Sequence, residues 1–205
     1  MSSRLFFQTG NAGKLSEASE LFGDLGVSVQ QFLIDGSPPE IHEPQQDGLV
    51  AVADSKLTQG LALLREHGLQ DSMMLVEDSG LFIDATPGYP GAYSARVLEA
   101  EGLDGVLSRL THLATPQQRG AEFRCAAALW TGSISISTVG FCRGHLTENP
   151  RGEGGFGFDP IFIPDDIENY STNGQTFAEV TSAVKARFSH RGSALRDLHE
   201  ALSLL

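Results

Sequence analysis

The sequence predicts a globular protein in which β-strands and α-helices are mixed, and three stretches carry this prediction. A short apolar strand at 5–7 leads through a glycine-containing turn into an amphipathic helix. The apolar run at 73–76 is typical of a buried strand. Near the end of the chain, apolar residues recur at helical spacing, so we expect a last helix with one buried face formed by Ala194, Leu195, Leu198, Leu202 and Leu205.

Length and composition indicate one domain, or one domain with two lobes, over residues 1–205. A chain of this size buries about 70% of its unfolded surface on folding, which is enough for a substantial core. No apolar run reaches the roughly 18 residues of a membrane span, and Met1–Arg4 lacks the apolar stretch of a signal peptide. Cys125 and Cys142 lie inside apolar strand patterns, which favours buried free thiols. We therefore expect a cytoplasmic protein without membrane contact.

The charge balance argues against a protein that binds the phosphate backbone of a nucleic acid. The formal net charge is −12, with 26 acidic residues against 14 basic ones, and the basic residues are scattered. Proteins that bind the phosphate backbone carry clustered Lys and Arg. An acidic protein can still bind a small anion where a few cations and a metal ion converge.

The turn at 9–14 follows the first strand and precedes a helix with Leu15, Ala18, Leu21, Phe22 and Leu25 on one face. This order aims backbone N–H groups and the helix dipole at an anion, and Lys14 adds a full positive charge. The turn is not a Walker A loop, because only two residues separate Gly10 from Gly13. The alternative is an ordinary turn with a solvated lysine.

A second strand is expected over 27–34, followed by a proline-rich loop over 38–44 and a helix over 47–64. Glu40 lies in the loop, where most acidic side chains are simply solvated. Lys56 lies on the polar side of the helix, so it is only a weak candidate for a functional site.

The central stretch is 76–81, where the buried strand is expected to end on two adjacent acids, Glu77 and Asp78, before Ser79 and Gly80 turn the chain. Buried acids are costly unless a charged group meets them, and divalent metal ions prefer oxygen ligands. The alternative is a turn whose acids face water. Successive strand residues point to opposite faces, so the two acids can share one site only if the strand ends or twists there.

The segment 95–113 is predicted to form two helical pieces broken near Gly102, and 122–130 with 134–141 a hairpin. A glycine-rich loop over 149–160 could approach a ligand closely, and Phe156 and Phe158 could stack on a base. A floppy surface loop is the alternative, although two exposed phenylalanines argue against it.

The polar residues near the C-terminus combine capping signals with cations. Thr176 and Glu179 fit a capping box, so a short helix is expected to start there. Ser189 or a neighbour is expected to cap the last helix. His190 and Arg191 then lie at a helix N-terminus, which the helix dipole disfavours for cations unless they face an anion or a carbonyl-rich ligand. An ordinary surface pair is the alternative.

Five motifs occur in order between Thr9 and Leu195: TGNAGK, EDSGL with PGAYSAR, GGFGFDPIF, TFAEV and SHRGSAL. Together they resemble the inosine triphosphate pyrophosphatase family, which hydrolyses non-standard purine nucleoside triphosphates. The resemblance implies an α/β fold with an elongated mixed sheet flanked by helices, and two lobes with the active cleft between them. It also implies a homodimer, a Mg²⁺ cofactor and a small-molecule nucleotide substrate.

The resemblance also implies roles for individual residues. Asp78 matches the proton acceptor, and the metal ligands implied are Glu40, Glu77 and Asp78. The residues that match substrate contacts are Thr9, Gly10, Asn11, Ala12, Gly13, Lys14, Ser79, Phe156, Gly157, Phe158, Asp159, Lys185, His190 and Arg191.

The reaction we predict is metal-assisted hydrolysis of the α–β phosphoanhydride of ITP, dITP or XTP, yielding the nucleoside monophosphate and pyrophosphate. Lys14 and the N–H groups of the turn would hold the phosphates, with Lys185 beside them, while His190 and Arg191 would read the 6-keto purine. Two alternatives stay open: a nucleotide-sensing module without turnover, and a phosphotransferase, whose signature motifs do not occur.

Overall fold

The computed structural model describes residues 4–205, which form two compact units. The first unit takes in the chain up to Asp78 together with residues 125–139 and 194–205. The second consists of residues 79–124 and 140–193. Each unit has its own hydrophobic core, so we describe them separately.

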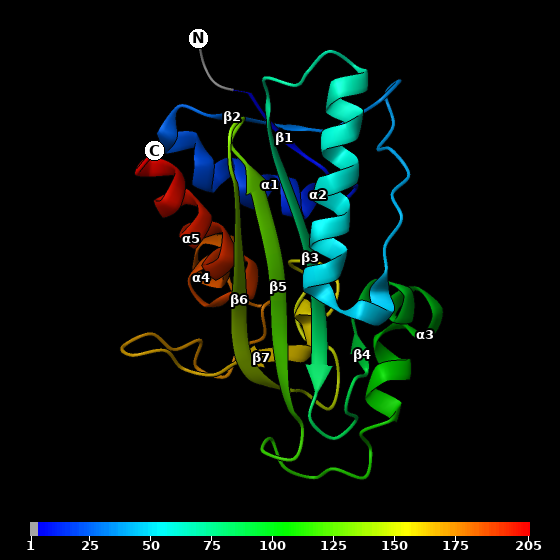
Figure 1. The fold of residues 1–205 in the computed structure, drawn as a ribbon. Helices are drawn as coiled ribbons and strands as arrows, with labels where there is room; N and C mark the ends of the chain where they lie inside the picture. The colour runs from blue at the N-terminus through cyan, green and yellow to red at the C-terminus, as the bar shows by residue number, and fades with distance from the viewer. Residues whose placement is uncertain (1–3) are drawn as a thin grey trace. The chain divides into compact units, whose positions relative to one another are not determined.

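The strands form a mixed sheet in the order β2-β1-β3-β5-β6-β7, with β4 paired to β3 (Figure 1). β1 is parallel to β2 and β3, whereas β4 is antiparallel to β3 and β7 to β6. The predicted mixed sheet flanked by helices is therefore confirmed. The strand bounds are β1 Arg4–Phe7, β2 Ser28–Gln31, β3 Met73–Ile83, β4 Pro90–Gly91, β5 Gly120–Trp130, β6 Ser135–Leu146 and β7 Phe162–Pro164.

The α-helices are α1 Ala12–Phe22, α2 Leu49–Glu66, α3 Ser94–Ser108, α4 Ser182–Phe188 and α5 His190–Ser203. The predicted break at Gly102 is confirmed, because this residue adopts a φ of 65° inside α3. Short 3₁₀ turns occur at Gly23–Leu25, Gln45–Asp47 and Asp159–Ile161. Within residues 4–205, no helix is both long and apolar enough to cross a membrane.

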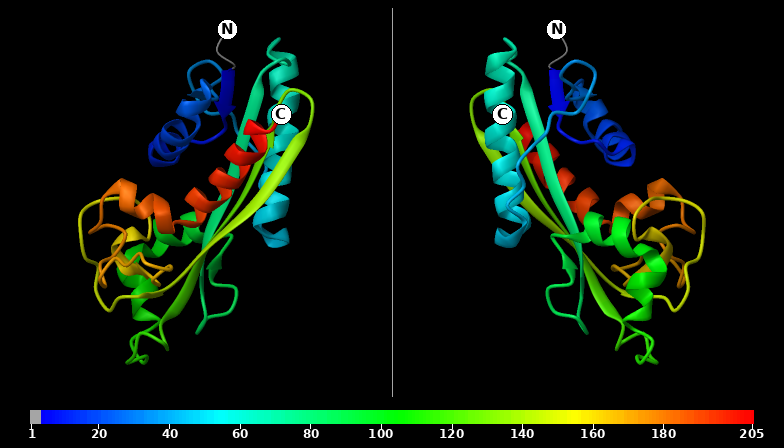
Figure 2. Two further views of the ribbon diagram at one scale, coloured as in Figure 1. Left: turned by 90° about the vertical axis from the view of Figure 1, so that its left-hand side faces the viewer. Right: turned by 90° about the vertical axis from the view of Figure 1, so that its right-hand side faces the viewer.

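In the first unit, α2 covers one face of the strands while α1 and α5 cover the other (Figure 2). Leu75 and Cys125 belong to the core on the α1 and α5 side, which is completed by Leu5, Phe7, Ala18, Phe22, Leu195 and Leu198. Met74 points to the opposite face, where α2 approaches closely at Gly60. A β-carbon at Gly60 would come within 3.2 Å of the Met74 methyl group. Alternate residues of β3 therefore serve two different helical layers.

The core of the second unit is rich in aromatic residues. Phe123 packs against the rings of Phe162 and Phe177, with centroid distances of 4.5 and 6.3 Å. Leu81, Ile83, Val106, Leu110, Ile161 and Phe188 complete this core. It forms the base on which the glycine-rich loop and α4 rest.

Three predictions about local structure were wrong. β3 does not end at Glu77 and Asp78 but continues to Ile83, because β4 pairs with it at Leu81 and Phe82. The second strand covers only Ser28–Gln31. The expected capping box does form a hydrogen bond, from the Thr176 N–H to Glu179 Oε2 at 2.8 Å, but it closes a turn. The helix begins later, at Ser182, with Thr181 as its cap.

Candidate functional site

Glu77 and Asp78 lie side by side in β3, and each pairs with a lysine from a different helical layer. Lys14 of α1 forms an ion pair with Glu77 Oε1. Lys56 of α2 forms one with Asp78 Oδ1 at 3.0 Å. Because β3 stays extended here, alternation sends the two carboxylates to opposite faces of the sheet. A twist that turned both acids to one side was the condition for a shared site. Each acid has a cationic partner without such a twist.

Lys56, which the sequence offered only as a weak candidate, pairs with two acids in the structure. Its ammonium lies 3.0 Å from Asp78 Oδ1 and 2.8 Å from Glu43 Oε1, and it donates to the Glu77 carbonyl at 3.3 Å. Its side chain is only 12% exposed. The acid of the 38–44 loop that pairs with this lysine is Glu43. The metal-binding role that the resemblance implies for Glu40 stays a prediction. The sequence signal that could have found Lys56 is its place on the helix that follows this acidic loop.

The turn at 9–14 is already organised by its own side chains. Asn11 Oδ1 accepts hydrogen bonds from the N–H groups of Gly13 and Lys14, at 2.9 and 3.2 Å, and so caps α1. Thr9 Oγ1 accepts from the Asn11 N–H at 3.1 Å. Two of the N–H groups expected to hold an anion are therefore occupied by the cap. Lys14 supplies the charged donor of this turn.

Burial and charge act in opposite directions on the Asp78 carboxyl. Burial raises its pKa above the ordinary value, while Lys56 counteracts part of that increase. For Lys56, burial lowers the pKa, but the charge of Asp78 and the contact with Glu43 more than compensate, and its pKa is raised. Within residues 4–205, Asp78 Oδ2 is buried and has no hydrogen-bond partner. This oxygen is available to a ligand that donates a hydrogen bond or carries a positive charge.

Asp78 Oδ2 is the carboxylate oxygen of the pair that a cation could reach. Among the described residues, no three His, Cys, Asp or Glu side chains form a complete metal cage. Mg²⁺ commonly takes one or two protein carboxylates and completes its shell with water and substrate phosphates. Asp78 Oδ2 provides one such ligand. Glu77, 2% exposed, is held by Lys14 at one oxygen and by the Cys125 thiol, 3.5 Å away, at the other.

The second unit contains a buried ion pair beneath an aromatic ring. Lys185 Nζ lies 2.7 Å from Asp159 Oδ2, and the two side chains are 8% and 5% exposed. The same oxygen accepts a hydrogen bond from the Phe156 N–H at 2.7 Å, and the ammonium lies 4.3 Å from the centre of the Phe156 ring. Gly155, with a φ of 68°, allows this approach, because a β-carbon there would collide with the Asp159 carboxylate.

His190 and Arg191 are buried, 4% and 3% exposed, so they are not an ordinary surface pair. The His190 ring stacks on Phe123 with a centroid distance of 4.7 Å and an interplanar angle of 9°. Arg191 lies 3.4 Å from Ser79 Oγ and 5.4 Å from the centre of the Phe156 ring. Ser189 accepts from the Gly192 N–H at 2.9 Å, which confirms its role as the cap of α5.

The structure places two further expected site residues, Phe158 and Lys185, within the second unit. Phe158 is 5% exposed and belongs to the core of the second unit, so of the two rings only the half-buried Phe156 can offer a face to a base. Lys185, expected beside the phosphates, contacts Asp159 and Phe156 within the second unit, and its phosphate role stays a prediction.

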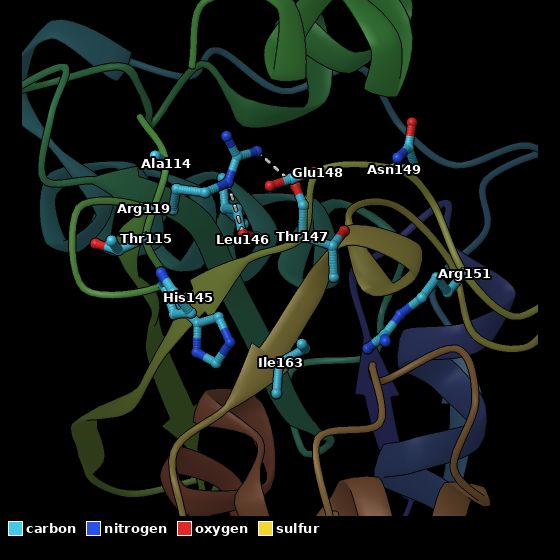
Figure 3. Close-up of a pocket in the computed structure, with 11 residues that line it drawn as sticks. Ala114, Thr115, Arg119, His145, Leu146, Thr147, Glu148, Asn149, Arg151 and Ile163 are labelled. Carbon is cyan, nitrogen blue, oxygen red and sulfur yellow. Dashed lines mark hydrogen bonds between the residues drawn. The ribbon is translucent and has the colours of Figure 1, made fainter. Parts of the chain in front are cut away.

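The second unit also contains a cavity of about 320 Å³, whose lining residues are drawn as sticks in Figure 3. Among the described residues that line it, none is an expected site residue. Arg119, buried at its wall, donates to the carbonyl oxygens of Leu110, Leu146 and Thr147. This arginine therefore joins the turn that follows α3 to the end of β6, which is a structural role.

Comparison with known proteins agrees with the motif order and the geometry. The model of the Ham1 family matches residues 5–201. This chain belongs to the Ham1 family. Relatives include a dITP/XTP pyrophosphatase of Thermococcus kodakarensis, 42% identical over 95% of this chain and 94% of the relative, and one of Ignicoccus hospitalis, 36% identical over 99% and 98%. The structure of a HAM1 protein from Coxiella burnetii has a TM-score of 0.75 at 29% identity, covering 99% of this chain and 100% of that one.

Proposed function

We propose that this Ham1 family member is a nucleoside triphosphate pyrophosphatase, which hydrolyses ITP, dITP and XTP to the monophosphate and pyrophosphate. The observation that carries the proposal is the pair of buried carboxylates in β3, each met by a lysine from a separate helix, with Asp78 Oδ2 left without a partner. The names of its relatives support the same reaction class.

On the phosphate side, Lys14 is the donor best placed to neutralise the triphosphate, because it extends from the turn capped by Asn11. The resemblance implies Glu40, Glu77 and Asp78 as ligands of Mg²⁺. Of these, Asp78 would offer Oδ2 to the ion, whereas both oxygens of Glu77 are held by Lys14 and Cys125. Neutralising the phosphate charge and orienting the leaving pyrophosphate is the chemistry that Mg²⁺ supplies when bound.

Asp78 is the group that would accept the proton of the attacking water. Its carboxyl is buried, which raises its pKa, while the positive charge of Lys56 counteracts part of that increase. Loss of that proton accompanies attack on the α-phosphorus and departure of pyrophosphate. Lys56 also remains tied to Glu43, so the carboxylate is held in one orientation.

Lys185 of α4 and Arg191 of α5 are donors that would favour a 6-keto purine. Lys185 and Arg191 can donate hydrogen bonds but cannot accept them. The O6 of hypoxanthine or xanthine is an acceptor, whereas adenine presents an amino donor at that position. Phe156 offers a ring for stacking, with both cations nearby. A site that hydrogen-bonds a substrate group discriminates strongly against an analogue that leaves those groups unpaired.

A panel of nucleoside triphosphates tests the proposal. With Mg²⁺ present, ITP, dITP and XTP should release pyrophosphate, and ATP should react far more slowly, by a factor of up to about 10⁴. Equal rates for ATP and ITP would refute the specificity, and release of orthophosphate would refute the reaction. Binding of ITP without any turnover would instead indicate a sensor. The cytoplasmic location, the single 1–205 domain with its cleft and the homodimer stay predictions.

A further inference from the structure

The cavity of the second unit has a buried arginine in its wall. Its volume of about 320 Å³ lies within the range of pockets that hold small molecules. Arg119 and Leu146 are buried, whereas Thr115, Glu148 and Arg151 are exposed, so the cavity opens to solvent (Figure 3). Among the described residues that line it, none takes part in the proposed reaction. The cavity is therefore a candidate for a ligand site of its own.

Arg119 carries its charge inside the protein without a carboxylate partner. It is 4% exposed, and within residues 4–205 no acidic side chain forms an ion pair with it. Its Nε, Nη1 and Nη2 each donate one N–H to a backbone carbonyl, of Leu146, Leu110 and Thr147 respectively. Because a guanidinium has five N–H groups, one remains on each terminal nitrogen. These two donors suit two oxygens of one carboxylate or phosphate group.

A second arginine lies at the rim of the cavity. Arg151 is 44% exposed, and its guanidinium donates to the Gly174 carbonyl at 2.6 Å and lies 3.3 Å from Glu179 Oε2. Both contacts are made by Nη2, and in the described part of the chain Nη1 and Nε have no acceptor. Asn149 adds a side-chain amide to the same rim. The rim therefore carries further donors for an anion held by Arg119.

The charges of both arginines act on one histidine that lines the cavity. Burial lowers the pKa of His145, Asp165 raises it, and Arg151 and Arg119 lower it further. Two positive charges are therefore close to the same ring. Burial lowers the pKa of Arg119, and the charge of Glu148, the acidic side chain among the described lining residues, counteracts part of this. Because Glu148 is exposed, water and salt screen its charge more than that of the buried guanidinium, and the inner part of the cavity stays positive.

We propose that this cavity is a second ligand site, which binds the phosphate group of a small molecule through Arg119 and Arg151. A phosphate group has three terminal oxygens, so it can accept from both arginines and from the amide of Asn149 at once. A carboxylate has only two oxygens and leaves more of these donors unused. The site goes beyond the proposed reaction and does not depend on it, because the two share no described residue.

Binding of inorganic phosphate can be followed at His145. The protein, labelled with ¹⁵N, is titrated with sodium phosphate at fixed pH and ionic strength, and its imidazole signals are recorded by NMR. The signal of His145 is identified by its absence from His145→Gln. We expect this signal to shift and to saturate, while those of His67 and His199, which do not line the cavity, stay in place. An unmoved His145 signal, or a shift that sodium chloride reproduces, would overturn the proposal.

Two matched variants test the arginine at the rim. Arg151→Gln removes a cation that lines the cavity. Arg109→Gln removes one that does not: Arg109 is 48% exposed and, like Arg151, pairs with one glutamate, Glu101 at 3.0 Å. We expect Arg151→Gln to weaken phosphate binding about tenfold or more, because a hydrogen bond to a charged group is lost, and Arg109→Gln to bind like the wild type. Wild-type affinity in Arg151→Gln, or equal weakening in both variants, would overturn the proposal.

Arg119→Lys tests the buried guanidinium itself. It keeps the positive charge but lacks the planar fork, so a folded variant should bind phosphate at least tenfold more weakly, and wild-type affinity would contradict the proposal. The substitution also takes donors from three carbonyl oxygens, so a melting curve accompanies it. Where this variant does not fold, Arg151→Gln with its Arg109→Gln control decides.

Lys14→Met distinguishes this site from the turn at 9–14. It removes the cation of that turn and leaves every described residue of the cavity in place. We expect phosphate to shift the His145 signal in this variant as in the wild type. Loss of the shift in Lys14→Met would assign the bound phosphate to the turn and overturn the proposal. Since no turnover is measured, a failure of the proposed reaction and a failure of this site are seen in separate experiments.

Discussion

Asp78→Asn separates the role of a general base from that of a structural acid. The change keeps the size and shape of the side chain, but an amide cannot accept the proton from water. The remaining Oδ1 can still accept from Lys56. Loss of general-base catalysis should lower kcat by about 10² to 10⁴, which is about 3–5 kcal/mol of transition-state stabilisation.

The effect on stability should be much smaller, because Lys56 is not left without a partner. Its ammonium keeps Glu43 at 2.8 Å and the Glu77 carbonyl at 3.3 Å. The variant also relieves the cost of burying an ionised carboxylate. We expect a loss of at most about 2 kcal/mol, instead of the 3–5 kcal/mol that follows when a buried charge loses its only partner. For a chain of this size, that corresponds to a decrease in Tm of up to about 8 °C.

Asp84→Asn is the matched control. Asp84 follows β3, and its carboxylate is 48% exposed and accepts a hydrogen bond from Arg143 Nη1 at 2.8 Å. Loss of an exposed pair costs about 0–1 kcal/mol, so this variant should keep wild-type kcat. The assays are pyrophosphate release, calorimetric titration with ITP and a melting curve. A folded Asp78→Asn protein that retains more than about a tenth of wild-type kcat would refute the base role.

Substitutions at three further residues test other parts of the second unit. Arg191→Ala should raise KM for ITP and reduce discrimination against ATP. Arg191→Lys should not restore the discrimination, because lysine lacks the planar guanidinium fork. Wild-type selectivity in the lysine variant would count against base recognition by Arg191. Lys185→Met removes the ammonium that lies 2.7 Å from the buried Asp159 carboxylate, so it should cost about 3–5 kcal/mol and lower Tm by about 6–20 °C. A shift under about 2 °C would contradict this. His145 has its pKa lowered by burial, so the folded state binds a proton less readily than the unfolded state; its contribution to stability is present above pH 6.5 and is lost as the pH falls through the lowered pKa. The difference in Tm between neutral and acidic pH should therefore shrink in His145→Gln, and an unchanged difference would rule out this contribution.

Local patterns in the sequence were sufficient for most elements. The 3.6-residue spacing of Leu49, Ala53, Leu57 and Leu64 predicted α2, because the side chains that repeat at this interval must share one buried face. The break in α3 was predictable for the same kind of reason, since glycine readily adopts the positive φ found at Gly102. The five motifs in order were enough to identify the family.

The charge partners of the site were decided by tertiary structure. Nothing local distinguishes Lys56 from a solvated helix lysine, or Glu43 from Glu40, because the contact with Asp78 joins residues 22 positions apart. The continuation of β3 past its two acids depends on β4, a strand of only two residues that carries little sequence signal. The periodicity of apolar residues predicts which side chains become buried, and this pattern is set by residues close together in the chain. Which charges then meet depends on how α1, α2 and β5 pack against β3, and that packing involves residues far apart in the sequence.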